Sequence, residues 1–497
     1  MREYVGVWYV NRGASAFILL LVLCSSFVLH AEVGITYAGE TIYIRAEGSV
    51  EGTSKIQREG NVYTFTGDIS DSLVVERDNI VVDGAGHVLE GAGAGRGISL
   101  EGRSNITIKN IAVREFDFGM VLSNSSGNTI SANAIANTST GIYLVSRSDS
   151  NSVSANNIAN NQFGISLTGA SNNSVSANNI TNNDVGISLT GASNNSISAN
   201  NMANNDVGIS LAGGSNNSIS VNNITNNNVY GIHLSFSLNN GISANNIANN
   251  TYGIYLYSPS GSNSMSANNI AYNDVGISFY SISNNLICHN NFVGNTVQAQ
   301  VIPLGYVNVW DDGYPSGGNY WSNYNGADKL NGILQNVAGS DGIGDSNYTI
   351  NSVNNDRYPL MGLLNTGDCG SWNSKQYYSN IVSNSTISAF SFNPSQKVIN
   401  FSVNGSSGTV GFCKITIDNA LLGGPYSVLV DGVPVSPSMT SNGTHSSLYF
   451  TYAHSAHSVS VTGTVVIPEF PSNLALMILV FAIFPIVLYA RRKRLLQ

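Results

Sequence analysis

Residues 182–201 read "NNDVGISLTGASNNSISANN", and residues 204–223 read "NNDVGISLAGGSNNSISVNN". The two stretches start 22 residues apart and differ at three of twenty positions. A near-identical copy at a fixed step is typical of a repeat protein, in which each unit packs against its neighbours. The pattern inside one copy therefore indicates the fold.

Apolar and polar residues alternate within each copy. Ile187 and Leu189 flank Ser188, and Ile197 and Ala199 form a second apolar pair around one serine. A period of two predicts short strands with one buried face. The Asn, Gly and Ser residues between these runs favour tight turns, so each copy predicts one coil of two or three short strands.

Two residue types keep this step along the chain. A glycine followed by Ile-x-Leu or a close variant recurs every 22 or 23 residues at Gly97, Gly119, Gly141, Gly164, Gly186, Gly208, Gly231, Gly253 and Gly276. An asparagine recurs at Asn133, Asn156, Asn178, Asn200, Asn222, Asn245, Asn268 and Asn290. We expect these asparagines to form a ladder in which each amide hydrogen-bonds to the amides of the neighbouring coils.

The predicted fold is all-β: a right-handed parallel β-helix of about ten coils, each 22–23 residues long, whose strands pair at the ordinary spacing of about 4.8 Å. Helical repeats are excluded because the units lack helix formers and a period of 3.6 residues. Leucine-rich repeats need several leucines in each unit, and here there is usually one.

The repeats resemble those of the NosD-like family of parallel β-helix proteins over roughly residues 75–295, and "DNIVVDGAGHVLEG" (78–91) is similar to the family's usual first coil. The family includes a periplasmic protein needed for copper-site assembly and many archaeal surface proteins. The resemblance implies the fold. It does not imply an activity, because β-helices serve as lyases, hydrolases, epimerases and inert stalks.

Both ends of the chain resemble targeting segments. Residues 1–31 are expected to be a signal peptide, and residues 473–490 are apolar enough to span a membrane before the basic "RRKR". The tail 467–497, with "IPEFPS", resembles the PEF-type C-terminal signals of archaeal surface proteins. These features predict a secreted protein anchored at the cell surface by a span or a processed tail, with the basic end cytoplasmic unless it is cut.

Between these ends the sequence predicts four regions. They are an N-terminal cap (32–75), the β-helix (76–295), an aromatic C-terminal cap (296–365) that resembles the capping segment of archaeal NosD-like proteins, and a small β-sandwich (366–466). An extracellular body would suit the Asn-x-Ser/Thr sequons as glycosylation sites; these include Asn105, Asn172, Asn179, Asn223, Asn347, Asn384 and Asn442.

The position between Ile and Leu of each glycine strand is predicted to face outward and to form a strip of hydroxyl groups. Tyr143 interrupts the strip on one side, and His233 with Tyr255 interrupts it on the other. Aromatic rings beside hydroxyls suit sugar faces, so these residues are candidate glycan ligands. Trp310 and Trp321 in the aromatic cap are further candidates.

Evidence for catalysis is sparse. From Ser148 to Asp328 there is no Lys or Arg, and between residues 150 and 310 the only carboxylates are Asp184, Asp206 and Asp274. Asp184 and Asp206 occupy the same place in successive coils, so they could divide acid and base work as in glycosidases. Their turn-like surroundings favour solvated turn residues instead.

Further candidates lie in the C-terminal third. Asp328, Asp341 and Asp345 could contribute to a Ca²⁺ site, although a hard cation needs six or more oxygens. Cys369 and Cys413 could form a disulfide, since an extracellular location permits one. For copper, the candidate ligands are His233, Cys288 and His289, with His454 and His457 further along the chain.

The sequence thus favours a structural or adhesive surface protein, for which glycan binding is a candidate role. A carbohydrate-active hydrolase, lyase or epimerase is the alternative, and copper handling is a weaker one. The net charge of −9, from only 10% charged residues, gives no basic surface for nucleic acid.

Overall fold

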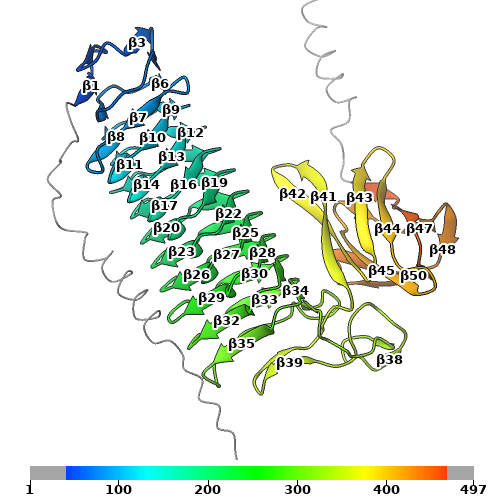
Figure 1. The fold of residues 1–497 in the computed structure, drawn as a ribbon. Helices are drawn as coiled ribbons and strands as arrows, with labels where there is room; N and C mark the ends of the chain where they lie inside the picture. Colours follow the sequence, from blue (N-terminus) through cyan, green and yellow to red (C-terminus); the bar gives the residue numbers. More distant parts are fainter. Residues whose placement is uncertain (1–40, 467–497) are drawn as a thin grey trace, which may run out of the picture. The chain divides into compact units, whose positions relative to one another are not determined.

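The computed structural model describes residues 41–466, and these residues form two compact units. The first unit contains residues 41–285 and 294–308, and the second contains residues 286–293 and 309–466. The strands of the first unit stack as successive coils (Figure 1). The chain makes about eleven turns of a right-handed parallel β-helix, which confirms the predicted fold class.

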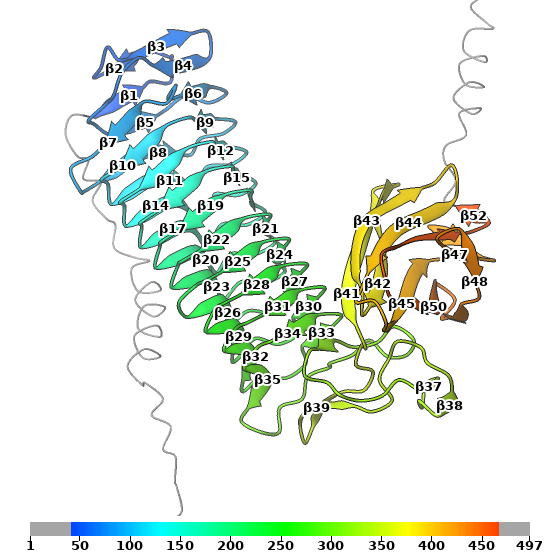
Figure 2. The same ribbon diagram turned by 45° about the vertical axis from the view of Figure 1, so that its right-hand side comes forward.

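Each full coil contributes one strand to each of three parallel sheets. Sheet A has the longest strands, which follow one another along the unit (Figure 2). Its order is β2 (Val50–Glu51), β1 (Ile42–Ile44), β5 (Leu73–Val75), β8 (Arg96–Glu101), β11 (Phe118–Ser123), β14 (Thr140–Val145), β17 (Phe163–Thr168), β20 (Val185–Thr190), β23 (Val207–Ala212), β26 (Tyr230–Ser235), β29 (Tyr252–Tyr257), β32 (Val275–Tyr280) and β35 (Val297–Ile302).

Within the first unit, sheets B and C are built from strands of three residues, apart from the four-residue β3 (Ile56–Glu59) and β4 (Val62–Phe65). There, sheet B contains β3, β4, β6 (Val81–Asp83), β9 (Thr107–Lys109), β12 (Thr129–Ser131), β15 (Ser152–Ser154), β18 (Ser174–Ser176), β21 (Ser196–Ser198), β24 (Ser218–Ser220), β27 (Gly241–Ser243) and β30 (Ser264–Ser266). Sheet C contains β7 (Val88–Glu90), β10 (Ala112–Arg114), β13 (Ala134–Ala136), β16 (Asn157–Ala159), β19 (Asn179–Thr181), β22 (Asn201–Ala203), β25 (Asn223–Thr225), β28 (Asn246–Ala248) and β31 (Asn269–Ala271).

The interior of the first unit follows the predicted alternation, with one exception. Ile187, Leu189 and Ile197 are fully buried and pair with their equivalents one coil away. Ala199 was expected to face inward, but it is exposed at a corner with φ of 54°. The chain turns there between sheets B and C, so the strand alternation ends one residue earlier, at Ser198.

Asparagine ladders occupy the corners between the sheets. The predicted ladder is confirmed: Asn178 Nδ2 donates to Asn200 Oδ1 at 2.9 Å, and Asn200 Nδ2 donates to Asn222 Oδ1 at 3.0 Å. Two more buried ladders accompany it. One runs through Asn128, Asn151, Asn173, Asn195, Asn217, Asn240, Asn263, Asn285 and Asn308, and the other through Asn161, Asn183, Asn205, Asn227, Asn250, Asn273 and Asn295.

The second unit begins with short strands and a loop-rich segment. These strands are β33 (Leu286–Cys288), β34 (Asn291–Val293), β36 (Tyr320–Trp321), the pair β37 (Leu330–Asn331) and β38 (Val337–Ala338), and the pair β39 (Tyr348–Asn351) and β40 (Asn354–Asp356). β36 pairs in parallel with β34, and Trp321 stacks on Phe292 with ring centroids 4.3 Å apart.

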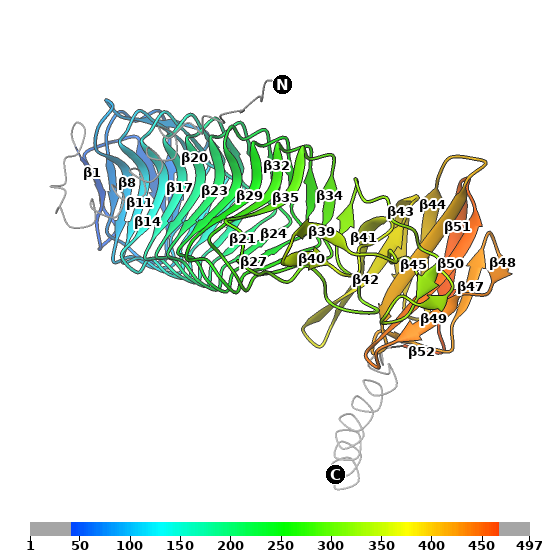
Figure 3. The ribbon, with the colours of Figure 1, turned by 90° about the horizontal axis from the view of Figure 1, so that it is seen from below.

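The rest of the second unit consists of two five-stranded antiparallel sheets over one apolar core (Figure 3). Sheet D has the order β41 (Leu363–Trp372), β42 (Lys375–Ser383), β45 (Val410–Asp418), β50 (His445–Ala453) and β49 (Ser438–Ser441). Sheet E has the order β43 (Thr386–Asn393), β44 (Val398–Asn404), β51 (His457–Thr462), β47 (Ser427–Val430) and β48 (Val433–Val435). The small pair β46 (Leu422–Gly423) and β52 (Val465–Val466) adjoins them.

Residues 41–466 include no helix long and apolar enough to cross a membrane. The predicted signal peptide (1–31), the PEF-type motif and the predicted span (473–490) all lie outside the described residues.

Candidate functional site

The outer face of sheet A carries three rows of side chains that run across the coils. The middle row is the predicted strip: Ser99, Val121, Tyr143, Ser166, Ser188, Ser210, His233, Tyr255 and Ser278. The row before the glycines reads Phe118, Thr140, Phe163, Val185, Val207, Tyr230, Tyr252 and Val275. Small side chains on the central coils therefore lie between two aromatic groups.

The larger aromatic group, which we call the tyrosine cluster, consists of Tyr230, His233, Tyr252 and Tyr255 on β26 and β29. The ring of Tyr230 stacks on His233 and on Tyr255, each with 5.0 Å between centroids. Tyr252 packs edge-on against Tyr255 at 5.4 Å. Both Tyr252 and Tyr255 are partly exposed, whereas the side chain of His233 is only 7% exposed. The accessible surface of the cluster therefore comes from tyrosine rings, and His233 stacks against Tyr230 and Tyr255 with little exposure of its own.

Burial controls the charge of this cluster. It lowers the pKa of His233 to about 4, so the imidazole is neutral near pH 7. Burial, with a smaller effect of Tyr252, raises the pKa of Tyr230 to about 12. The cluster is therefore an uncharged aromatic platform at physiological pH.

The second aromatic group is smaller. Phe118 and Tyr143, on adjacent coils, stack with centroids 5.6 Å apart. The third row adds Tyr257 and Tyr280, which stack at 5.4 Å beside the tyrosine cluster.

Trp310 and Trp321 were predicted to contact ligands, and the structure places them elsewhere. Each is only 1% exposed. The indole nitrogen of Trp310 donates to Asn354 Oδ1 at 3.1 Å, and that of Trp321 donates to Asp356 Oδ2 at 2.8 Å. Both rings belong to the interior of the second unit, because their polar edges are satisfied there and their faces are covered.

The carboxylates of Asp184 and Asp206 stand on successive coils just before β20 and β23. Partial burial, with a smaller effect of Asp206, raises the pKa of Asp184. Asp206 accepts a hydrogen bond from Asn228 Nδ2 at 2.7 Å, and the two backbone amides bond to the preceding coil. The pair therefore has the hydrogen bonding of turn residues, with no cationic side chain on these coils to assist catalysis.

Asp328, Asp341 and Asp345 tie a loop together through backbone amides. Asp328 accepts from the amides of Asp341 at 3.0 Å and Gly342 at 2.9 Å, and Asp345 accepts from those of Lys329 and Leu330. Burial, with a smaller effect of the two other carboxylates, raises the pKa of Asp328 to about 6. These oxygens already serve as acceptors, so the arrangement does not supply the six convergent ligands that calcium requires.

The suggested disulfide between Cys369 and Cys413 does not form. Cys288, Cys369 and Cys413 are free and buried thiols. β42 lies between β41, which carries Cys369, and β45, which carries Cys413. Two strand spacings are about 9.6 Å, beyond the span of about 7 Å that a disulfide bridges.

This arrangement predicts the behaviour of the thiols. A thiol reagent such as Ellman's is expected to leave Cys288, Cys369 and Cys413 unmodified in the folded protein and to modify all three in guanidinium without reductant. Mass spectrometry of the unfolded, alkylated protein measures this directly. A peptide in which Cys369 is linked to Cys413 would contradict the structure.

The fold defines a class of protein, the parallel β-helix, and comparisons with known proteins define the family. The model of the NosD family, described as "Periplasmic copper-binding protein (NosD)", matches residues 35–229 and 170–326. The chain belongs to this family. No curated protein matches the sequence.

Several solved structures are similar at low identity. The Dettilon tailspike protein (gp208) is 14% identical over 85% of both chains, with a TM-score of 0.41. The A-module of the mannuronan C-5 epimerase AlgE6 from Azotobacter vinelandii is 15% identical over 50% of this chain and 87% of that one, with a TM-score of 0.40. The periplasmic alginate epimerase AlgG is 14% identical over 55% of this chain and 82% of that one, with a TM-score of 0.39. These values are too low to bear on function.

The residues present do not fit a copper site. Copper needs several nitrogen or sulfur ligands that converge. His233 is stacked against Tyr230 and Tyr255, and His289 Nε2 lies 3.2 Å from Ser316 Oγ. His454 Nε2 contacts Ser385 Oγ at 2.8 Å, and His457 Nδ1 contacts Asp431 at 2.6 Å. Over residues 41–466 no group of three or more His, Cys, Asp or Glu side chains is placed to hold a metal ion.

Proposed function

We propose that this protein is a non-catalytic, glycan-binding β-helix of the cell surface, and that the tyrosine cluster on the outer face of sheet A contacts the glycan. The observation that supports this function is the pair of partly exposed rings, Tyr252 and Tyr255. Two and three coils away in the row of Tyr255 stand the hydroxyl groups of Ser210 and Ser188. Aromatic faces pack against the apolar faces of sugars, and hydroxyls bond to the sugar rims.

The favoured ligand is a neutral polysaccharide. From Ser148 to Asp328 the chain has no Lys or Arg, so a uronate on these coils would find no cationic partner. Burying an unpaired carboxylate against this surface would cost free energy, and the net charge of −9 would repel the polymer.

The proposed location is outside the cytoplasm. The family's description as periplasmic supports it. We further propose that residues 467–497 attach the protein to the cell surface, as a span or after processing, with residues 1–31 directing secretion.

The variant Tyr255→Ser tests the tyrosine cluster. Serine stands at the equivalent position of five other coils, so the fold should tolerate it; these are Ser99, Ser166, Ser188, Ser210 and Ser278. Loss of the ring is expected to weaken binding to a soluble neutral polysaccharide such as glucomannan or xylan by about tenfold, or ~1.4 kcal/mol. Affinity electrophoresis, with alginate as the anionic polymer, measures the change.

The matched control is Tyr272→Asn, which removes an exposed ring outside sheet A. Asparagine stands at the equivalent position in other coils, for example Asn182. This variant should bind as the unaltered protein does. Equal losses in both variants, or tighter binding to alginate than to the neutral polymers, would refute the proposed surface.

A carbohydrate-active enzyme is the second candidate, supported by the raised pKa of Asp184 beside Asp206. Purified protein is expected not to depolymerise or epimerise any polysaccharide of a panel. If it does, and if Asp206→Asn abolishes the activity, the enzymatic function replaces the non-catalytic one.

A further inference from the structure

A polar cavity of about 320 Å³ lies within the second unit, and all of its lining residues belong to that unit. Its floor is a row on the outer face of sheet D. Asn380 on β42 is paired with Thr416 on β45, which is paired with Ser447 on β50. Thr416 Oγ1 and Ser447 Oγ are hydrogen-bonded at 2.9 Å, so two hydroxyls and one amide are fixed side by side.

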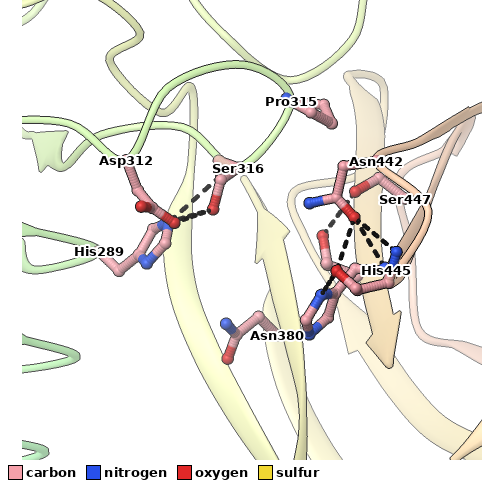
Figure 4. A pocket seen from close by; sticks show the side chains of 10 residues that line it. His289, Asp312, Pro315, Ser316, Asn380, Asn442, His445 and Ser447 are labelled. Atoms are coloured by element: carbon pink, nitrogen blue, oxygen red, sulfur yellow. Dashed lines mark hydrogen bonds between the residues drawn. The ribbon is translucent and has the colours of Figure 1, made fainter. Parts of the chain in front are cut away.

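One wall of the cavity is a chain of three side chains (Figure 4). Ser316 Oγ donates to Asp312 Oδ2 at 2.8 Å and lies 3.2 Å from His289 Nε2. The loop that carries Ser316 is held by Lys414, whose Nζ donates to the carbonyl of Pro315 at 2.9 Å. This wall is therefore positioned by sheet D itself rather than by a free loop.

The opposite wall is the turn before β50. Asn442 Oδ1 accepts from the amides of Thr444 at 3.1 Å and His445 at 2.8 Å. These bonds fix the amide plane, and Figure 4 shows the side chain of Asn442 toward the cavity. Its Nδ2 has no protein partner among residues 41–466, and the same is true of Nδ2 of Asn380, whose Oδ1 accepts from Thr366.

The lining selects a chemical class of ligand. Nine of the ten lining residues have polar side chains, Pro315 being the exception, so an apolar molecule would leave many groups without hydrogen bonds. Asp312 is the only carboxylate, and no Lys or Arg lines the cavity. An anionic ligand would therefore meet no cation. The volume is at the lower end of the range of about 300–1,000 Å³ for small-molecule sites.

The geometry points to a binding site for one neutral sugar unit in this cavity, with Asn380 donating to a ring hydroxyl and Asp312 accepting from one. The site is separate from the tyrosine cluster, which lies in the first unit, and it goes beyond the function proposed above. A free monosaccharide or a terminal unit of a longer glycan presents the same hydroxyl groups.

The same geometry argues against hydrolysis at Ser316. In a catalytic triad the carboxylate orients the histidine, and the histidine takes the proton of the serine. Here Asp312 accepts from the serine instead, and no carboxylate among the lining residues orients His289. Burial lowers the pKa of His289, so it is neutral near pH 7 and serves as a hydrogen-bonding wall.

Saturation-transfer NMR on the purified full-length protein tests the site. The probes are D-glucose, D-galactose, D-mannose and N-acetyl-D-glucosamine, with D-glucuronate as the anionic counterpart. At least one neutral sugar is expected to bind in the millimolar range, and D-glucuronate is not expected to displace it. Asn380→Ala and Asp312→Asn are each expected to weaken this binding by about tenfold or more.

Two further variants make the result decisive. Asn404→Ala removes an exposed amide on β44, outside the cavity lining, and should leave binding unchanged. Tyr255→Ser should also leave it unchanged, which separates this site from the tyrosine cluster. Thermal unfolding midpoints show whether each variant is folded. If Asn380→Ala is unstable, Asp312→Asn alone tests the proposed sugar site. The site is refuted if no neutral sugar binds, if neither variant weakens binding, or if glucuronate binds more tightly.

Discussion

Replacing Asn200 with alanine is expected to lower the free energy of unfolding by about 3–6 kcal/mol, because buried polar groups then lose their partners at about 1–3 kcal/mol each. Asn200 is 1% exposed and stands in the middle of its ladder. Its Oδ1 accepts from the backbone N and from Nδ2 of Asn178, at 3.0 and 2.9 Å. Its Nδ2 donates to the carbonyl of Val175 at 2.9 Å and to Asn222 Oδ1 at 3.0 Å. Alanine removes all four bonds.

The neighbouring residue provides the control. Asn201 is exposed, and its amide forms a surface ladder with Asn179 at 2.8 Å. Because water replaces these partners, Asn201→Ala should cost less than about 1 kcal/mol. Urea unfolding followed by circular dichroism compares the two midpoints. Equal shifts in both variants would show that the buried ladder does not stabilise the coils.

This ladder could be predicted from the sequence because its residues keep the period of the glycines. The two other ladders keep the same period, so their asparagines are equally visible in the sequence. Asn173 and Asn183, for example, recur as Asn195 and Asn205 in the next coil. These ladders were not predicted, because asparagine is common in ordinary turns. Sequence alone does not distinguish a buried corner amide from an exposed one. The repeat period thus predicts the coils. Whether each asparagine belongs to a buried ladder depends on its burial, which the period does not reveal.

Outside the repeats, contacts depend on residues far apart in the chain, and no period reveals them. Trp321 is buried because Asp356, 35 residues later, accepts its indole N–H. The separation of Cys369 from Cys413 depends on β42 lying between their strands. The cavity in the second unit combines side chains from segments that begin at His289 and end at Ser447. Local patterns predict strands in this region, but they do not predict which strands are neighbours.

The second large effect is expected at the glycine that is the second residue of each strand of sheet A from β8 to β32. A Cβ atom at Gly186 would lie 2.6 Å from the carbonyl oxygen of Gly208 in the next coil. Since that oxygen belongs to a backbone held on both sides by parallel pairing, it cannot move without separating the coils. Gly186→Ala is therefore expected to destabilise the protein by about 3 kcal/mol or more, at the upper end of what overpacking costs.

Gly241 gives the opposite expectation within the same unit. It lies on β27, no atom lies within 4 Å of the position that a Cβ atom would take, and the paired residues of the neighbouring coils are Ser218 and Ser264. Gly241→Ala is expected to stabilise the protein by about 0.4–1 kcal/mol, because alanine restricts the unfolded chain without strain in the folded one. Urea midpoints of the two variants should shift in opposite directions. If both midpoints shift in the same direction, the close approach at Gly186 does not explain why glycine is needed there. The flexibility of the chain at glycine would then be the explanation.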